Sequence, residues 1–135
     1  MHIIPRMVVG LDIDGTITAA PEFFSMLTKA VYREGGKVLI ISARTKSSAV
    51  REHTEDELRG YGVIYSKLIL LPTGEEMLGE APKQLDWLER FLWQKVHISV
   101  CEHVQCFFDD DPTVIDLFSR YAPWVQIYHS IVPEN

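Results

Sequence analysis

The stretch Met7–Thr16, MVVGLDIDGT, places two carboxylates directly after a run of apolar residues. A short, continuous apolar run is typical of a strand that is buried on both faces, and we expect this strand over Met7–Ile13. Ionisable side chains are costly in a buried setting unless they are paired or hold a metal. Asp12 and Asp14 therefore mark a candidate functional site. Because alternate residues of a strand share a face, we expect both carboxylates to point the same way.

The rest of the chain alternates short apolar runs with amphipathic segments. Further buried strands are predicted over 37–42, 67–72, 104–108 and 124–129. Helices are predicted over 21–34, 47–58, 81–96 and 112–121. This alternation favours an α/β three-layer sandwich, in which a doubly wound parallel sheet of about five strands carries helices on both faces. We expect a single domain over 1–135, with ligands bound beyond the carboxyl ends of the strands.

The composition narrows the classes of function. A formal net charge of −6 disfavours a broad basic surface and leaves nucleic acid open as a partner. No apolar run approaches the roughly 20 residues that span a bilayer, and the N-terminal stretch lacks a signal-peptide pattern. The two cysteines, Cys101 and Cys106, do not make a disulfide framework. We therefore expect a cytoplasmic protein without a membrane partner.

Polar side chains gather at the predicted strand ends. The second strand ends in Ser42, followed by Ala43 and Arg44, and the fourth is followed by the acidic run 109–111. Lys83 lies at the start of the predicted third helix. Carboxylates brought together would repel one another, and Mg²⁺ is a hard cation that prefers such oxygen ligands. With a hydroxyl and a lysine beside it, the acidic cluster suits the transfer of a phosphoryl group.

These elements resemble the haloacid dehalogenase (HAD) phosphohydrolase superfamily. The resemblance rests on DIDGT, on the hydroxyl that ends the second strand, on the lysine that opens a helix, and on FFDDDP at the end of the fourth strand. It implies a phosphatase that hydrolyses phosphate monoesters through an aspartyl-phosphate, with Mg²⁺ as cofactor. The intervals between the motifs are too short for the cap domains of this family. A small capless member has an open site, which implies a large or nucleotide-like phosphorylated substrate, or a second copy of the chain that closes the site.

The resemblance also implies a role for each residue. Asp12 is the nucleophile, and Asp14 is the acid that protonates the leaving group and then the base that activates water. Ser42 and Lys83 complete the implied catalytic set, by donating to the phosphoryl oxygens and by neutralising their charge. The implied phosphate- and substrate-binding residues are Gly15, Thr16, Ser42, Ala43 and Arg44. The implied metal ligands are Asp12, Asp14 through its backbone carbonyl, Asp109 and Asp110.

The acidic run leaves a choice of which two aspartates serve the site. Pro112 suits the first position of a helix, which makes Asp111 its N-cap. That leaves Asp109 and Asp110, of which we favour Asp109 as the direct metal ligand. Asp110 then supports the site or pairs with its lysine.

Two other lysines compete with Lys83. Lys67 comes before a strand and is expected at the opposite edge of the sheet. Lys95 lies late in the third helix and is expected to point away from the site, so Lys83 is preferred. Arg44 keeps two interpretations, as a bidentate clamp on an anionic group or as an exposed loop residue.

Two other functions compete with a phosphatase. A receiver-type signalling domain would need a phosphorylatable aspartate after the third strand, which ends LILLP instead. A HAD-fold binding or regulatory protein without catalysis would have no need of the full set of acids. Selection among nucleotide, polynucleotide-end, sugar-phosphate and phosphoprotein substrates is expected to depend on Arg44, the flap over 17–20 and the loop over 73–79.

Overall fold

The sheet is parallel throughout, as the sequence predicts. The computed structural model describes residues 6–74 and 79–130. Within them, five strands pair in the order β3-β2-β1-β4-β5, with β1 (Val8–Leu11) at the centre. The other strands are β2 (Lys37–Ser42), β3 (Lys67–Leu70), β4 (Cys106–Asp109) and β5 (Gln126–His129).

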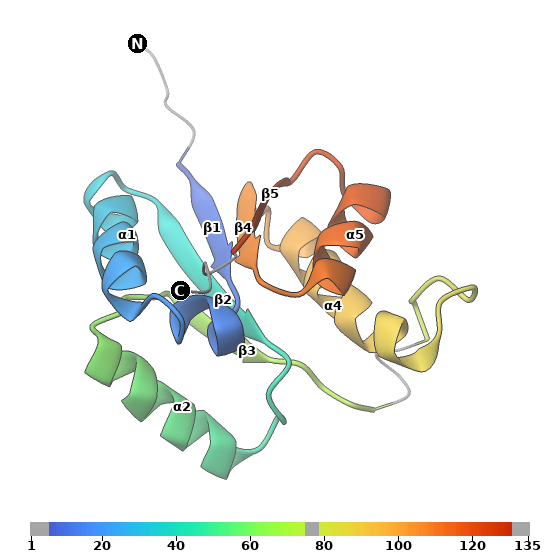
Figure 1. Cartoon of the computed structure of the whole chain (residues 1–135), viewed down its shortest axis with the longest axis horizontal. Coiled ribbons are helices and arrows are strands. Elements are labelled where there is room, and N and C mark those ends of the chain that lie inside the picture. Colours follow the sequence, from blue (N-terminus) through green and yellow to red (C-terminus); the bar gives the residue numbers. More distant parts are fainter. Residues whose placement is uncertain (1–5, 75–78, 131–135) are drawn as a thin grey trace, which may run out of the picture.

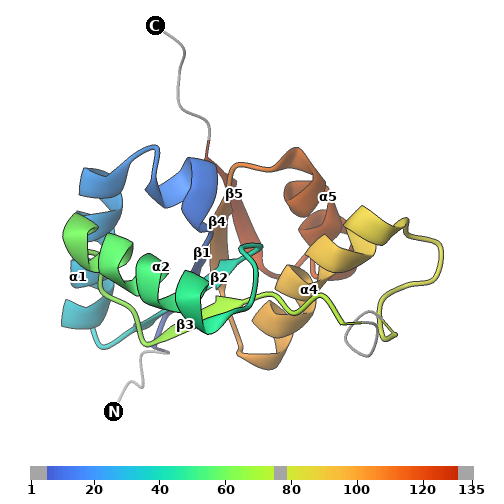
Figure 2. The same cartoon turned by 90° about the horizontal axis from the view of Figure 1, so that it is seen from below.

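Helices cover both faces of this sheet (Figures 1 and 2). Helices α1 (Pro21–Arg33) and α2 (Ser48–Tyr61) lie on one face. Helices α4 (Trp87–Cys101) and α5 (Pro112–Tyr121) lie on the other. The predicted three-layer α/β architecture is therefore confirmed. The winding direction reverses between β1 and β4, which creates the switch point where sheets of this type bind ligands.

The apolar runs of the sequence are buried on both faces. In β2, Val38 and Ile40 pack into the core under α1 and α2, whereas Leu39 and Ile41 pack into the core under α4 and α5. Complete burial of such a side chain contributes about 1.5–3 kcal/mol. Two cores that share one strand explain why β2 reads as a continuous apolar run rather than an alternating one.

Helix α4 begins later than predicted. Asp86 accepts a hydrogen bond from the Glu89 N–H at 2.8 Å, and the Glu89 side chain accepts one from the Asp86 N–H at 3.2 Å. This reciprocal capping box fixes the first helical residue at Trp87. The segment 81–86, predicted as the first turns of the helix, therefore lies outside it. Lys83 sits exposed in a turn of that segment.

The connections between strands are short where the sequence predicts no cap domain. Residues 12–36 are all described, and a brief helical turn, η1 (Ile13–Ile17), and α1 fill the connection between β1 and β2. Part of the loop over 73–79, to which we assigned a role in substrate selection, lies outside the described residues. No helix among the described residues is both long and apolar enough to cross a bilayer.

Candidate functional site

The ends of two neighbouring strands bring the acidic motifs together. Leu11 of β1 pairs in register with Phe108 of β4, so Asp12 and Asp109 follow at adjacent positions. The Asp12 N–H extends the ladder by donating to the Phe108 carbonyl at 3.0 Å. Asp12 is 6% exposed and Asp109 is fully buried. Two carboxylates are therefore held side by side inside the protein, where they need compensation.

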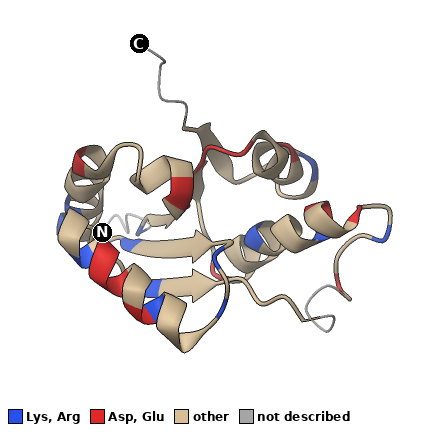
Figure 3. Ribbon diagram, turned by 60° about the horizontal axis from the view of Figure 1, so that its bottom comes forward, with Lys and Arg blue, Asp and Glu red and all other residues tan. Residues whose placement is uncertain are grey.

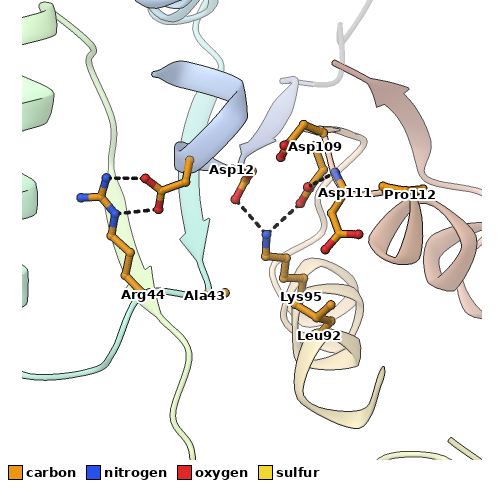
Figure 4. A pocket seen from close by; sticks show the side chains of 10 residues that line it. Asp12, Ala43, Arg44, Leu92, Lys95, Asp109, Asp111 and Pro112 are labelled. Atoms are coloured by element: carbon orange, nitrogen blue, oxygen red, sulfur yellow. Dashed lines mark hydrogen bonds and ion pairs between the residues drawn. The ribbon is translucent and has the colours of Figure 1, made fainter. Parts of the chain in front are cut away.

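The compensating cation is Lys95 and not Lys83. Its Nζ donates to Asp12 Oδ1 at 2.9 Å and to Asp109 Oδ2 at 2.8 Å (Figure 4). Lys95 lies in the second half of α4, and its side chain is only 3% exposed where it meets the two carboxylates at the strand ends. The expectation that Lys95 points away is therefore wrong. Lys83 precedes the helix in an exposed turn and does not line the pocket at the strand ends, so the structure does not bring it to the site.

Burial and charge shift the pKa values of this cluster. Burial alone would lower the pKa of the Lys95 ammonium, but the Asp12 and Asp109 carboxylates outweigh it and raise that pKa. Lys95 therefore stays protonated. Burial, reinforced by the neighbouring Asp12 and Asp109 carboxylates, raises the pKa of Asp110 to about 6. The cluster thus has more negative charge than one lysine neutralises.

Asp111 caps α5, as the sequence predicts. Its carboxylate accepts a hydrogen bond from the Thr113 N–H at 2.9 Å, and Pro112 is the first residue of the helix. The Asp111 N–H donates in turn to Asp109 Oδ1 at 3.0 Å. The cap therefore also orients the buried Asp109, whose other oxygen is bound to Lys95.

The chain turns sharply at the DGT segment. Gly15 has φ +83°, and a Cβ there would clash with the Asp110 carboxylate, so this position requires glycine. Its N–H donates to Thr18 Oγ1 at 2.9 Å and stabilises the turn, whereas we expected it to face a phosphate. The buried Thr16 hydroxyl donates to Asp12 Oδ2 at 3.1 Å. In this structure both residues hold the turn and the Asp12 side chain.

The two motif carboxylates take different partners. Strand β1 ends at Leu11, two residues earlier than predicted, so strand alternation no longer governs Asp14. Its carboxylate accepts from Arg44 Nε at 2.9 Å and from Arg44 Nη2 at 2.8 Å (Figure 4), while Asp12 binds Lys95. The expectation that both carboxylates point the same way is therefore wrong. The hydrogen bonds from Arg44 hold the pKa of the Asp14 carboxyl below its usual range.

The end of β2 forms the adjoining wall. Ser42 is buried, and its Oγ accepts a hydrogen bond from the Arg44 N–H at 3.1 Å. Its hydroxyl hydrogen can still be donated to a bound group. Ala43 lines the pocket directly.

These walls enclose a pocket of about 480 Å³ at the switch point (Figure 4). Its lining residues are Asp12, Asp14, Ala43, Arg44, Leu92, Lys95, Asp109, Asp110, Asp111 and Pro112. Five of them are aspartates and two are cations, so the pocket carries excess negative charge. Figure 3 shows the same acidic colouring along the loop that leads into α5.

The acidic cluster meets the requirements of a hard divalent cation. Side-chain oxygens of Asp12, Asp109 and Asp110 all lie within 4.8 Å of one another. Mg²⁺ prefers carboxylate oxygens and is commonly held by a few of them together with water and phosphate. The excess negative charge and the raised pKa of Asp110 both fit a cation that neutralises the cluster. The residues present therefore fit Mg²⁺.

Two parts of the site were not predicted from the sequence. Lys95 was discounted because the helix start was misplaced, although the Asp-x-x-Glu of the capping box is readable as a start signal. Thr54 and Glu57 of α2 both accept hydrogen bonds from Arg44. No pattern in the sequence distinguishes these two residues, because α2 carries many charged side chains and its sequence is typical of a solvent-exposed helix.

Comparisons with known proteins extend only to the fold. Neither a family model nor a curated protein matches this chain. A chain in a structure of the Pnkp1/Rnl/Hen1 RNA repair complex superposes with a TM-score of 0.66 at 21% identity, over 93% of this chain and 42% of that one. A chain in a second structure of the Pnkp1/Rnl/Hen1 complex gives a TM-score of 0.63 at 22% identity, over 93% of this chain and 46% of that one. This chain thus spans less than half the length of these neighbours, with which it shares an α/β fold.

Proposed function

We propose that this chain is a Mg²⁺-dependent phosphatase of the HAD type, which hydrolyses phosphate monoesters through an aspartyl-phosphate on Asp12. The observation that supports the proposal most strongly is the position of Lys95 between the buried Asp12 and Asp109 carboxylates. A buried lysine that bridges two carboxylates at a ligand-binding edge provides both a nucleophile and a charge to stabilise a phosphoryl group.

Asp12 is well prepared to attack phosphorus. Lys95 binds its Oδ1 and Thr16 binds its Oδ2, so the carboxylate is fixed in one orientation. In the proposed reaction an Asp12 oxygen forms a bond to phosphorus while the ester bond to the leaving group breaks. Water then attacks the phosphorus, which releases inorganic phosphate and regenerates Asp12.

Asp14 is the group proposed to move protons. It lines the same pocket as Asp12, and its side chain is 65% exposed, so it can reach the leaving group and the attacking water. The lowered pKa favours the ionised form, which suits the acceptance of a proton from water. For the first step, Asp14 must take up a proton before it can deliver one to the leaving-group oxygen.

The proposed metal ligands are the carboxylates of Asp12, Asp109 and Asp110, with the Asp14 carbonyl as the family resemblance implies. When bound there, Mg²⁺ would neutralise phosphoryl oxygens and the excess charge of the pocket. Ser42 would donate its remaining hydrogen to the same group.

A candidate substrate is the phosphorylated end of an RNA or of another polynucleotide. The two structural neighbours belong to complexes with other proteins, one of which is named an RNA repair complex. The short connection between β1 and β2 supports an open site that admits a large substrate.

We also propose a cytoplasmic location, with a partner or a second copy of the chain closing the site. A regulatory HAD-fold protein without catalysis is the alternative.

A phosphate-release assay tests this proposal. The panel contains p-nitrophenyl phosphate, nucleotides, sugar phosphates, a phosphopeptide and oligonucleotides with a 3′- or 5′-phosphate, each with Mg²⁺ or with EDTA. We expect Mg²⁺-dependent release that falls at least ~100-fold in Asp12→Asn, since the asparagine amide cannot form the acyl phosphate. Release that is unchanged in Asp12→Asn would exclude Asp12 as the nucleophile. No release from any member of the panel despite Mg²⁺ binding would favour the regulatory alternative.

A further inference from the structure

Arg44 uses its complete hydrogen-bonding capacity within the protein. A guanidinium carries five N–H donors. The Nε and one Nη2 hydrogen bind the two oxygens of Asp14, at 2.9 and 2.8 Å. The other Nη2 hydrogen and one Nη1 hydrogen bind the two oxygens of Glu57, at 3.0 and 3.2 Å. The last Nη1 hydrogen binds Thr54 Oγ1 at 3.1 Å.

The two carboxylates grip adjoining edges of one planar group. Asp14 binds the edge formed by Nε and Nη2, and Glu57 binds the edge formed by Nη2 and Nη1. Such paired, charge-assisted bonds fix the plane of a guanidinium as well as its position. The Arg44 side chain is only 17% exposed, which limits screening by solvent.

Helix α2 anchors this arrangement. Thr54 is fully buried, and Glu57 lies three residues further on the same face of the helix. The Tyr61 hydroxyl donates to Glu57 Oε1 at 3.4 Å, which adds a further restraint one turn later. Asp14, the carboxylate on the other side of Arg44, lies on the turn after β1, and its side chain is largely exposed. Helix α2 therefore supports, through Arg44, a carboxylate whose side chain is 65% exposed.

We propose that Glu57 and Thr54 are positioning residues for Asp14, which they orient through Arg44. In this role Arg44 acts on Asp14 and does not bind the substrate, because each of its donors already has an acceptor in the protein. The sequence leaves two interpretations open for Arg44, a clamp on an anionic group or an exposed loop residue. The positioning role differs from both. The role rests on the phosphatase activity proposed above.

The function of such support is to hold Asp14 where protons are transferred. A displacement of a catalytic group by about 1 Å costs on the order of 100-fold in rate. Loss of the support should therefore lower kcat, since proton transfer belongs to the transition state, and leave KM unchanged. Loss of a phosphate clamp would instead raise KM.

Three variants test the proposal against a matched control. Glu57→Gln is expected to lower kcat ~10-fold and Arg44→Lys ~100-fold, each without a change in KM. The double variant should be no slower than Arg44→Lys, because both changes remove one connected unit. Glu52→Gln, an exposed acid on the same helix without a bond to Arg44, should match the wild type. Circular dichroism checks that each variant is folded.

A second readout does not depend on turnover. In proton–nitrogen NMR spectra of the wild type, the Arg44 Nη hydrogens that bind Glu57 should give signals that exchange slowly with water, and Glu57→Gln should remove them, whereas Glu52→Gln should not. A raised KM with unchanged kcat, wild-type kinetics in Glu57→Gln, or Nη–H signals that survive in Glu57→Gln would each overturn the positioning role. A wild type that hydrolyses nothing overturns the proposed function, and the NMR comparison then decides alone whether Glu57 holds Arg44.

Discussion

The Nζ of Lys95 lies 2.9 Å from Asp12 Oδ1, although the two residues are 83 positions apart in the chain. Their side chains are 3% and 8% exposed, so this ion pair lies inside the protein. Asp109, 1% exposed, completes the group at 2.8 Å from the same nitrogen. A buried charge that loses its partner is strongly destabilising, whereas the intact group can be roughly neutral. The intact group is therefore not explained by stability alone, which agrees with the role in the reaction that we propose.

Replacing Lys95 with methionine should damage both activity and folding. Asp12 and Asp109 would face each other without a cation, which should lower the free energy of unfolding by about 3–5 kcal/mol in the absence of metal. Phosphate release should fall below detection. Urea denaturation and the phosphate-release assay measure the two effects, with Lys83→Met as the control because Lys83 lies in an exposed turn. Loss of activity in Lys83→Met with activity retained in Lys95→Met would restore the original assignment.

Replacing Asp110 with asparagine should stabilise the metal-free protein. The pKa of Asp110 is raised to about 6, so the group is ionised at neutral pH at a free-energy cost that the unfolded chain does not have, and removing that charge relieves the repulsion. The wild type should gain thermal stability when Mg²⁺ is added, and Asp110→Asn should lose most of this gain. Differential scanning fluorimetry with and without Mg²⁺ measures both changes. Asp116→Asn, on the exposed face of α5, serves as the control, and a full Mg²⁺ response in Asp110→Asn would remove Asp110 from the ligand set.

Replacing Gly15 with alanine should distort the acidic cluster. The positive φ of +83° costs an alanine roughly 1–2 kcal/mol, and its Cβ would displace the Asp110 carboxylate. We expect a lower unfolding free energy together with weaker stabilisation by Mg²⁺. Gly60→Ala is the matched change, since open space surrounds Gly60 in α2 and alanine there should stabilise by up to about 1 kcal/mol. Equal effects at the two positions would contradict the close approach of Gly15 to Asp110.

Most of the fold could be predicted because its apolar pattern is simple. The continuous run of β2 requires burial on two faces. Helix α2 ends at Tyr61, three residues later than predicted, with Gly62 in the left-handed region. Asp111 and Pro112 identified the start of α5 for a local, physical reason: a cap and a residue that needs no N–H. These signals act over a few residues and can be read directly from the chain.

The site was predicted less completely because it depends on helix phase and on long-range pairing. The start of α4 was predicted too early, and Lys83 was therefore assigned to the site in place of Lys95. The capping box of Asp86 and Glu89 marks the correct start in the sequence. The early end of β1 sent Asp14 toward Arg44 rather than alongside Asp12. Pairing between residues on separate elements leaves no local pattern.

The two cysteines should differ sharply in reactivity. Cys101 is exposed at the end of α4, whereas Cys106 is buried in β4, where burial raises the pKa of its thiol. Iodoacetamide should therefore modify Cys101 in the native protein and reach Cys106 only after unfolding in urea. Peptide mass spectrometry separates the two sites. Rapid native modification of Cys106 would show that the central sheet opens more readily than its packing implies.

The most direct test of the central claim is to trap the covalent intermediate. The protein is mixed with Mg²⁺ and the best substrate of the panel, quenched early in turnover, and reduced with borohydride, which converts an aspartyl-phosphate to homoserine. We predict that peptide mass spectrometry finds homoserine at Asp12, that homoserine is absent from Asp12→Asn, and that its formation requires Mg²⁺. Rapid turnover with homoserine at another aspartate, or with none at any aspartate, would contradict Asp12 as the nucleophile.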